Sequence, residues 1–340
     1  MHRFKRTLAA FAMVASVVGG TAGWASAGAQ SAVTGPPPGA AAWRSEGLID
    51  PATATPSQVA AFFAGLDERR RDDLVRRHPL TVGNLDGAPV ALRYAANRAA
   101  LAADGRFARL LAPGRQILAF DPRGRGQVAE VYGDLTRARH VSVVVPGSDI
   151  DASTYDRAKD PYGTPAGMAK SLRGATRPGS TAVVAWVGYT TPVGVGVDAA
   201  SGALAEAGAE RLSRFVAGLD AVGVDDPAVF CHSYGSVVCG LAAPRLDAAD
   251  IVALASPGMR VDDAADLRTG ARVWAAKDPT DWIDNVPNVQ VLGVGHGADP
   301  ASASFGARRI PTAGAHGHTG YFAPGTDSLR AFAAIAEGRT

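Results

Sequence analysis

The sequence predicts an α/β fold with a mostly parallel central sheet, helices on both faces and an N-terminal helical extension. From residue 116 onward, short apolar segments of strand length alternate with segments of helical periodicity. One of these apolar segments passes through a turn of small residues around Ser233 directly into a helical segment. The chain of 340 residues is 47% hydrophobic and 19% charged, so it is long and apolar enough to build one large core or two small ones.

The N-terminus has the three-part pattern of a secretory signal peptide over residues 1–27. Residues 1–6 carry three positive charges, residues 8–18 are apolar, and Ala25-Ser26-Ala27 is a small-x-small cleavage site. Glycines interrupt the short apolar core, which argues against a transmembrane anchor, and no cysteine follows it that could carry a lipid. We therefore expect a secreted, extracellular protein that is cleaved near Ala27.

The charge balance excludes some classes of partner. The whole chain has a net charge of +2, but residues 1–27 hold three of its basic residues and none of its acidic ones, which leaves about −1 after cleavage. Basic stretches that could follow a phosphate backbone or a membrane surface are not evident. We expect neither a nucleic-acid partner nor a stable membrane anchor.

The remaining chain divides into a lead-in, a helical segment and the α/β part. Residues 28–56 are rich in Ala, Gly, Pro, Ser and Thr and are expected to be a flexible lead-in without a fold of its own. Residues 57–114 are expected to be helical, and residues 115–340 form the α/β part. The strands expected there are 117–120, 128–132, 141–145, 182–187, 228–231, 251–255, 272–275 and 308–312. The helices expected there are 163–173, 202–220, 235–243 and 326–337.

Ser233 stands where a nucleophilic serine is presented on a sharp strand-to-helix turn. Such a turn is so tight that its neighbours must be small, and Cys231, Gly235 and Ser236 satisfy this requirement. The usual motif is G-x-S-x-G, and Cys231 replaces its first glycine. The turn therefore predicts a nucleophile, although its first position departs from the motif.

A serine nucleophile needs a histidine to accept its proton and a carboxylate to orient that histidine. In α/β-hydrolases the acid and then the histidine follow the serine, each after a later strand. Asp278 and His318 occupy these places, and Asp278 is also compatible with a purely local Asp-Pro turn. The alternatives that remain open are Asp281 and Asp284 for the acid and His316 and His296 for the histidine.

Backbone amides are expected to stabilise the oxyanion that forms during acyl transfer. The residue after the nucleophile supplies the first amide, which here is that of Tyr234. The turn Pro146-Gly147-Ser148 after strand 141–145 offers the second, with Ser148 as the candidate and Asp149 next to it. A simple turn at the end of a strand is the alternative interpretation.

Several aromatic residues fall near the expected carboxyl ends of strands, where open α/β sheets bind ligands. They are candidates for an acyl pocket, and packing in the core is the alternative for each. These residues are Tyr155, Trp186, Tyr189, Trp282, Tyr321 and Phe322.

The two cysteines, Cys231 and Cys239, flank the candidate nucleophile. A disulfide and a pair of buried thiols are both compatible with their spacing. His316 and His318 have no third ligand at a metal-binding spacing, and the glycine pairs near Gly194 and Gly293 lack the context of a dinucleotide site. We expect no metal and no cofactor.

Several short motifs along the chain together match one known family. They are residues 83–87 with Asn97-Arg98, 145–147, 186–189, 232–236, 255–258, 295–300 and 318–322. With these motifs the chain resembles the secreted actinobacterial α/β-hydrolase family that was formerly catalogued as a domain of unknown function and is distantly similar to cutinases. The resemblance covers residues 57–337 and implies an α/β-hydrolase fold with Ser233, Asp278 and His318 as the triad.

These inferences together predict a secreted serine hydrolase that cleaves carboxylic esters through an acyl-enzyme. Its expected substrate is a small-molecule or surface-displayed ester. Cleavage of amides or thioesters uses the same groups and remains an alternative, as does a non-catalytic secreted binding protein that retains the fold.

Overall fold

The computed structural model describes residues 29–340, and the predicted signal peptide lies outside the described residues. An eight-stranded sheet forms the centre, in the order β1-β2-β4-β3-β5-β6-β7-β10. Its strands from β3 to β10 are parallel, whereas β2 pairs antiparallel with both β1 and β4. The strands are β1 (Ile117–Asp121), β2 (Gln127–Tyr132), β3 (His140–Val145), β4 (Thr181–Val187), β5 (Ala228–His232), β6 (Asp250–Leu254), β7 (Arg272–Ala276) and β10 (Arg308–Arg309).

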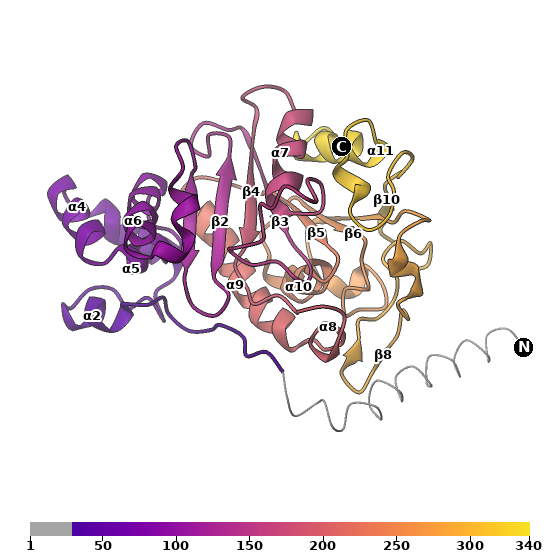
Figure 1. Cartoon of the computed structure of the whole chain (residues 1–340), viewed down its shortest axis with the longest axis horizontal. Helices are drawn as coiled ribbons and strands as arrows, with labels where there is room; N and C mark the ends of the chain where they lie inside the picture. The colour runs from indigo at the N-terminus through magenta and orange to yellow at the C-terminus, as the bar shows by residue number, and fades with distance from the viewer. Residues whose placement is uncertain (1–28) are drawn as a thin grey trace, which may run out of the picture.

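Helices cover both faces of this sheet, as Figure 1 shows. Helices α7 (Pro165–Ala175) and α11 (Asp327–Ala336) bury their apolar sides against one face, and α9 (Ala203–Asp220) and α10 (Gly235–Ala242) against the other. Every residue of β4, β5 and β6 is buried, as expected for strands covered on both sides. The predicted α/β class and its mostly parallel sheet are confirmed.

The strand order reverses at β3, between the neighbouring strands β3 and β5. The chain passes from β3 to β4 on one side of β3 and then returns to place β5 on its other side. Open α/β sheets bind ligands at such a reversal, because the loops after the two strands diverge there. Ser148 follows β3 and Ser233 follows β5, so the sequence-predicted site falls at this point.

The N-terminal helices pack beside β1, at the edge of the sheet (Figure 1). The side-chain amide of Asn97 donates to the carbonyl oxygen of Ile117 at 3.1 Å, and the buried Asp86 pairs with Arg93 at 3.2 Å and with Arg211 of α9 at 3.3 Å. Strands β2, β4 and β3 separate this edge from β5. These helices are α3 (Pro56–Ala64), α4 (Glu68–Arg77), α5 (Pro79–Asn84), α6 (Val90–Ala103) and the 3-10 helix η1 (Gly105–Leu111).

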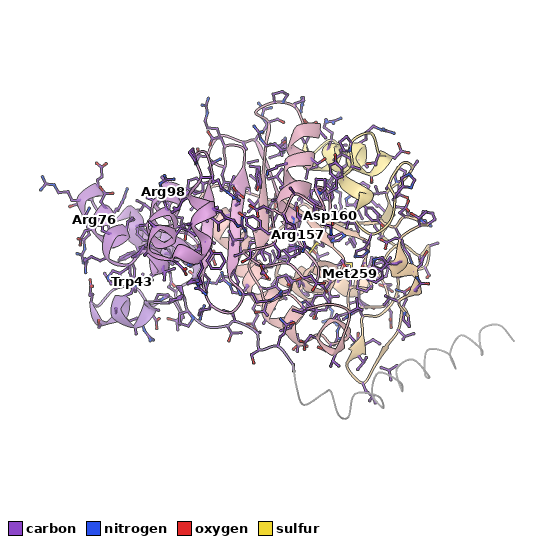
Figure 2. All side chains as sticks on the ribbon, viewed as in Figure 1. Trp43, Arg76, Arg98, Arg157, Asp160 and Met259 are labelled. Carbon is purple, nitrogen blue, oxygen red and sulfur yellow. A yellow bond between two sulfur atoms is a disulfide. The ribbon has the colours of Figure 1, made fainter. Side chains whose placement is uncertain are left out.

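The lead-in differs from the expectation of a segment without a fold. It contains helix α2 (Ala40–Ser45), and the Trp43 ring in that helix is fully buried against Phe62 and Phe63. The indole N–H of Trp43 donates to the carbonyl oxygen of Ile49 at 2.6 Å. Figure 2 shows Trp43 within the N-terminal helices and well away from Met259 in the α/β part. The buried Trp43 therefore anchors part of a segment whose composition suggested a linker.

The remaining short elements lie in loops at the two ends of the sheet. A two-stranded hairpin, β8–β9, was not predicted from the sequence, and β10 is shorter than the strand predicted over 308–312. No helix within residues 29–340 combines the length and the apolar character needed to cross a membrane. The elements are α8 (Val197–Ala200), η2 (Ala243–Arg245), η3 (Ala265–Leu267), η4 (Trp282–Asn285), β8 (Gln290–Val291), β9 (Val294–Gly295) and η5 (Gly320–Phe322).

Candidate active site

Ser233 occupies a strained turn between β5 and α10. Its φ angle is 55°, in the left-handed region that residues with a side chain rarely adopt. Its amide donates to the carbonyl oxygen of Leu254 at 3.0 Å, and its own carbonyl oxygen accepts from the amide of Ser236 at 2.9 Å. Hydrogen bonds on both sides therefore hold the residue in this conformation, as the sequence motif predicted for a nucleophile.

Two glycines allow the backbone to approach Ser233 closely. A Cβ atom on Gly235 would lie 2.5 Å from the carbonyl oxygen of Val145. A Cβ atom on Gly147 would lie 2.6 Å from the Cβ atom of Ser233 and 3.1 Å from the amide nitrogen of Tyr234. Any larger residue at these positions would push the loop after β3 away from the serine.

His318 lies between Ser233 and an aspartate. Its Nε2 atom is 2.9 Å from Ser233 Oγ, and its Nδ1 atom is 2.8 Å from an oxygen of Asp281. This arrangement requires the tautomer in which Nδ1 carries the proton and donates it to the carboxylate, so that Nε2 is free to accept from the serine hydroxyl. The three side chains come from three separate loops at the carboxyl ends of β5, β7 and β10.

The structure corrects the predicted acid, because Asp281 and not Asp278 contacts His318. One oxygen of Asp278 accepts from the amide and the hydroxyl of Thr280, at 2.9 and 2.5 Å, so Asp278 closes the Asp-Pro turn that was its alternative role. The Thr280 hydroxyl oxygen in turn accepts from the amide of Gly317, next to His318, at 2.8 Å. Asp278 therefore supports the histidine loop indirectly, from a place three residues before the acid.

Asp281 is held ionised in a buried position. Its second oxygen accepts from the Tyr321 hydroxyl at 2.7 Å, and its first also accepts from the amide of Ile283 at 2.9 Å. Burial favours the neutral acid, but the hydrogen bonds from His318 and Ile283 outweigh it, and the pKa of Asp281 is lowered. Burial raises the pKa of Tyr321, which keeps its hydroxyl protonated as a donor.

The other sequence alternatives have different positions. His296 is buried and donates from Nε2 to the carbonyl oxygen of Ala199 at 2.7 Å, whereas His316 is exposed. Asp284 forms an ion pair with Lys277. Within residues 29–340, none of the three forms a hydrogen bond or ion pair with Ser233 or His318.

In the described part of the chain, the amides of the two expected oxyanion donors are free of other hydrogen bonds. Within residues 29–340, the amides of Tyr234 and Ser148 have no hydrogen-bond acceptor, so both N–H groups are available to a ligand. The amide of Asp149, the alternative donor, is already committed to the carbonyl oxygen of Pro192 at 2.8 Å. The Tyr189 hydroxyl donates to the carbonyl oxygen of Pro146 at 2.7 Å and fixes the start of this loop.

Of the aromatic residues proposed for an acyl pocket, only Trp282 is exposed. Its ring lies 4.4 Å from the ring of His318, at the mouth of the site. The other five, Tyr155, Trp186, Tyr189, Tyr321 and Phe322, are buried in the core. Within residues 29–340, no group of three or more His, Cys, Asp or Glu side chains could hold a metal ion.

Comparison with known proteins identifies the family. A family described as alpha/beta hydrolase matches residues 121–291, which is half of the chain and includes Ser233 and Asp281. The chain belongs to the alpha/beta hydrolase family. Both the match and the order of the strands support this fold.

Relatives of this alpha/beta hydrolase include two proteins of Mycobacterium tuberculosis, from strains CDC 1551 and H37Rv, that are named only as uncharacterized. Each is 27% identical over 373 aligned positions, which cover 85% of this chain and 56% of the relative. The chain thus spans little more than half the length of these relatives.

Solved structures with a similar chain path include XC6422 from Xanthomonas campestris, described as an a/b serine hydrolase without lid. It is 16% identical, with a TM-score of 0.40, over 67% of this chain and 95% of that one. Another is Est1E from Butyrivibrio proteoclasticus, which is 10% identical with a TM-score of 0.37, over 66% of this chain and 99% of that one.

His232 is a residue of the hydrolase site that the sequence analysis did not single out. It directly precedes Ser233, and its Nε2 atom lies 2.8 Å from the carbonyl oxygen of His318, so the ring must donate from Nε2. Burial, together with the proximity of His318, lowers the pKa of His232 to about 3. The neutral ring therefore ties the serine turn to the histidine loop.

The two cysteines of the hydrolase are joined. Cys231 at the end of β5 and Cys239 in α10 form a disulfide with Cα atoms 6.4 Å apart, so the first of the two sequence alternatives holds. The bond spans the turn that carries Ser233. A cysteine at the first motif position therefore serves as a link between strand and helix.

We predict that His232 stays neutral in the folded protein between pH 8 and pH 5. The unfolded chain binds a proton near pH 6.5 but the folded one does not, so the free energy of unfolding falls as the pH drops through 6.5, by about 2 kcal/mol between pH 7 and pH 5 from this group. NMR titration of the imidazole and urea unfolding at both pH values measure this. His232→Gln, which keeps a donor for the His318 carbonyl, should lose this part of the pH dependence. A His232 resonance that titrates near pH 6.5 would contradict the prediction.

We also predict that the disulfide stabilises the fold by about 2–3 kcal/mol, the amount expected from closing a loop of this length in the unfolded chain. Urea unfolding of the wild type and of the double variant Cys231→Ser/Cys239→Ser measures the difference. Thiol titration of denatured, unreduced protein should detect no free thiol, and two free thiols would show that the bond does not form.

Proposed function

We propose that this alpha/beta hydrolase is a secreted serine hydrolase that cleaves carboxylic esters through an acyl-enzyme. The observation that carries the proposal is the pair of hydrogen bonds linking Ser233 to His318 at 2.9 Å and His318 to Asp281 at 2.8 Å. A serine hydroxyl becomes an effective nucleophile when a histidine, oriented by a carboxylate, accepts its proton.

In the proposed acylation step, Ser233 Oγ forms a bond to the ester carbonyl carbon while its proton passes to His318 Nε2. The ionised Asp281 stabilises the positive imidazolium. The carbonyl oxygen becomes an oxyanion, for which the amides of Tyr234 and Ser148 are the proposed donors. His318 then gives its proton to the alcohol oxygen as the carbon–oxygen bond breaks, and the alcohol leaves.

In deacylation a water molecule takes the place of the alcohol. His318 accepts a proton from the water as the water oxygen bonds to the acyl carbon, and returns it to Ser233 Oγ as the acid product leaves. The proposed steps balance with water as the only co-reactant.

The proposed substrate is a soluble or surface-displayed ester. Amides and thioesters are cleaved by the same groups, and a screen of acyl chains and leaving groups ranks them. Secretion is part of the proposal, and the disulfide between Cys231 and Cys239 supports it because such bonds persist in oxidising compartments.

Labelling with a fluorophosphonate probe tests the nucleophile. We expect the wild-type protein to be labelled and Ser233→Ala to be unlabelled, with ester turnover reduced by more than about 10³-fold, because the attacking oxygen is removed. Thermal unfolding of both proteins controls for misfolding. An unlabelled wild type, or equal ester turnover by the two proteins, would instead favour a non-catalytic binding protein.

Asp281 and Asp278 provide a matched pair for testing the acid. Asp281→Asn should lower kcat by about 10⁴-fold, because an amide does not enforce the required His318 tautomer. Asp278→Asn should lower kcat by less than about tenfold, because an asparagine oxygen can still accept from Thr280. Steady-state kinetics on one soluble ester compares them, and an equal loss in both variants would refute the assignment of Asp281.

A further inference from the structure

Large apolar side chains are exposed in only two segments of the described chain, residues 193–197 and 282–292. Elsewhere in residues 29–340, large hydrophobic side chains are buried or half-buried. Exposed apolar residues that gather on one surface are candidates for contact with something other than water. We call these residues the apolar rim: Val193, Val195, Val197, Trp282, Val289, Val291 and Leu292.

Both segments of the apolar rim border the proposed active site. The Trp282 ring lies 4.4 Å from that of His318, and the amide of Gly194 donates to Asp149, which follows Ser148, at 2.8 Å. A β-bridge between Ser201 and Val294 connects the chain just after each of the two segments. Figure 1 shows the corresponding elements, α8 and β8, at the same end of the molecule, opposite the N-terminal helices.

The Leu292 side chain packs against nothing in residues 29–340, so the fold does not explain why this residue is a leucine. It is 100% exposed, and with Gly293 it forms the two-residue turn between β8 and β9, where their φ angles are 50° and 84°. Positive φ at both positions is the turn type that favours Asn-Gly. Leucine is strained in this conformation and buries no surface in return. An external contact accounts for this residue better than the fold does.

The charges in the two segments and in the residues that flank them restrict what the rim contacts. Residues 188–202 contain one acidic residue, Asp198, and residues 282–297 contain one, Asp284; neither segment contains a lysine or an arginine. The nearby guanidinium of Arg260 donates to the carbonyl oxygens of Gly293 and Gly295. Surfaces of anionic lipid attract basic clusters, which are absent here, so an uncharged or zwitterionic surface matches the rim.

We propose that the apolar rim docks reversibly onto the surface of uncharged or zwitterionic lipid and brings Ser233 to esters within that surface. The choice of substrate rests on the proposed ester hydrolysis, whereas docking itself does not. Trp282 is the rim residue that lies against His318, so a lipid surface that contacts Trp282 lies close to the position from which an ester would reach Ser233.

Flotation with phosphatidylcholine vesicles tests docking. The wild-type protein should float with the vesicles, and Leu292→Asn should lower the partition coefficient about tenfold, because the apolar side chain that would enter the lipid is removed. Leu292→Met, which stays apolar, is the matched control and should float like the wild type. Asparagine tolerates positive φ, so thermal unfolding of Leu292→Asn should occur at an equal or higher temperature. Val195→Ser repeats the test on the other segment of the rim.

Activity and docking are separated by two further measurements. Ser233→Ala should float like the wild type, so failure of the proposed chemistry would leave the docking result intact. Leu292→Asn should keep the wild-type turnover of a short soluble ester and lose about tenfold on an ester carried in the vesicles. The proposal is overturned if the wild type does not float, or if Leu292→Asn floats equally well. It is also overturned if sedimentation shows a wild-type dimer that Leu292→Asn dissociates, since the rim would then bind a second copy of the chain.

Discussion

The close approach of backbone segments at the end of β5 is the constraint on which the site depends. Ser233 is held at a positive φ that costs about 1–3 kcal/mol, and the hydrogen bonds to Leu254 and Ser236 keep it there. Gly147 and Gly235 let the loop after β3 pass against the serine. Because β3 and β5 are neighbours in the sheet, the loop after β3, which carries the available amide of Ser148, meets the turn that carries Ser233. The order of the strands thus places groups together that are far apart in the sequence.

The sequence predicted those features that depend on local pattern and chain order. The main strands and helices, and the turn at Ser233, follow from short-range periodicity and small residues. The acid could not be chosen in this way, because Asp278 and Asp281 lie in the same loop. Asp278 turns back to Thr280, while Asp281 begins η4 and points toward His318. Which of the two aspartates reaches His318 depends on how the turn at Asp278-Pro279 orients the residues after it. The Asp-Pro pair was the available signal that Asp278 would close that turn.

Long-range packing also ordered segments whose composition suggested loops. The helix around Trp43 forms because its indole fills a space between Phe62, Phe63 and His78. A tryptophan isolated in an Ala- and Pro-rich stretch was the available signal, since so large an apolar surface is rarely left in water. The β8–β9 hairpin has two residues in each strand, too few for an alternation to be recognised. In both cases tertiary contacts decide the structure.

Polar groups help to fix both segments of the apolar rim in place. Gln30 accepts from the amide of Val193 and donates to the carbonyl oxygen of Thr191, and Arg260 binds two carbonyl oxygens of the hairpin. Backbone N–H and C=O groups near these loops form hydrogen bonds with polar side chains of the protein. Valines and Leu292 in the same loops are exposed to solvent. Docking onto lipid would therefore require no rearrangement of the loops that border His318. The Trp282 ring, 4.4 Å from that of His318, is the contact that links the rim to the site.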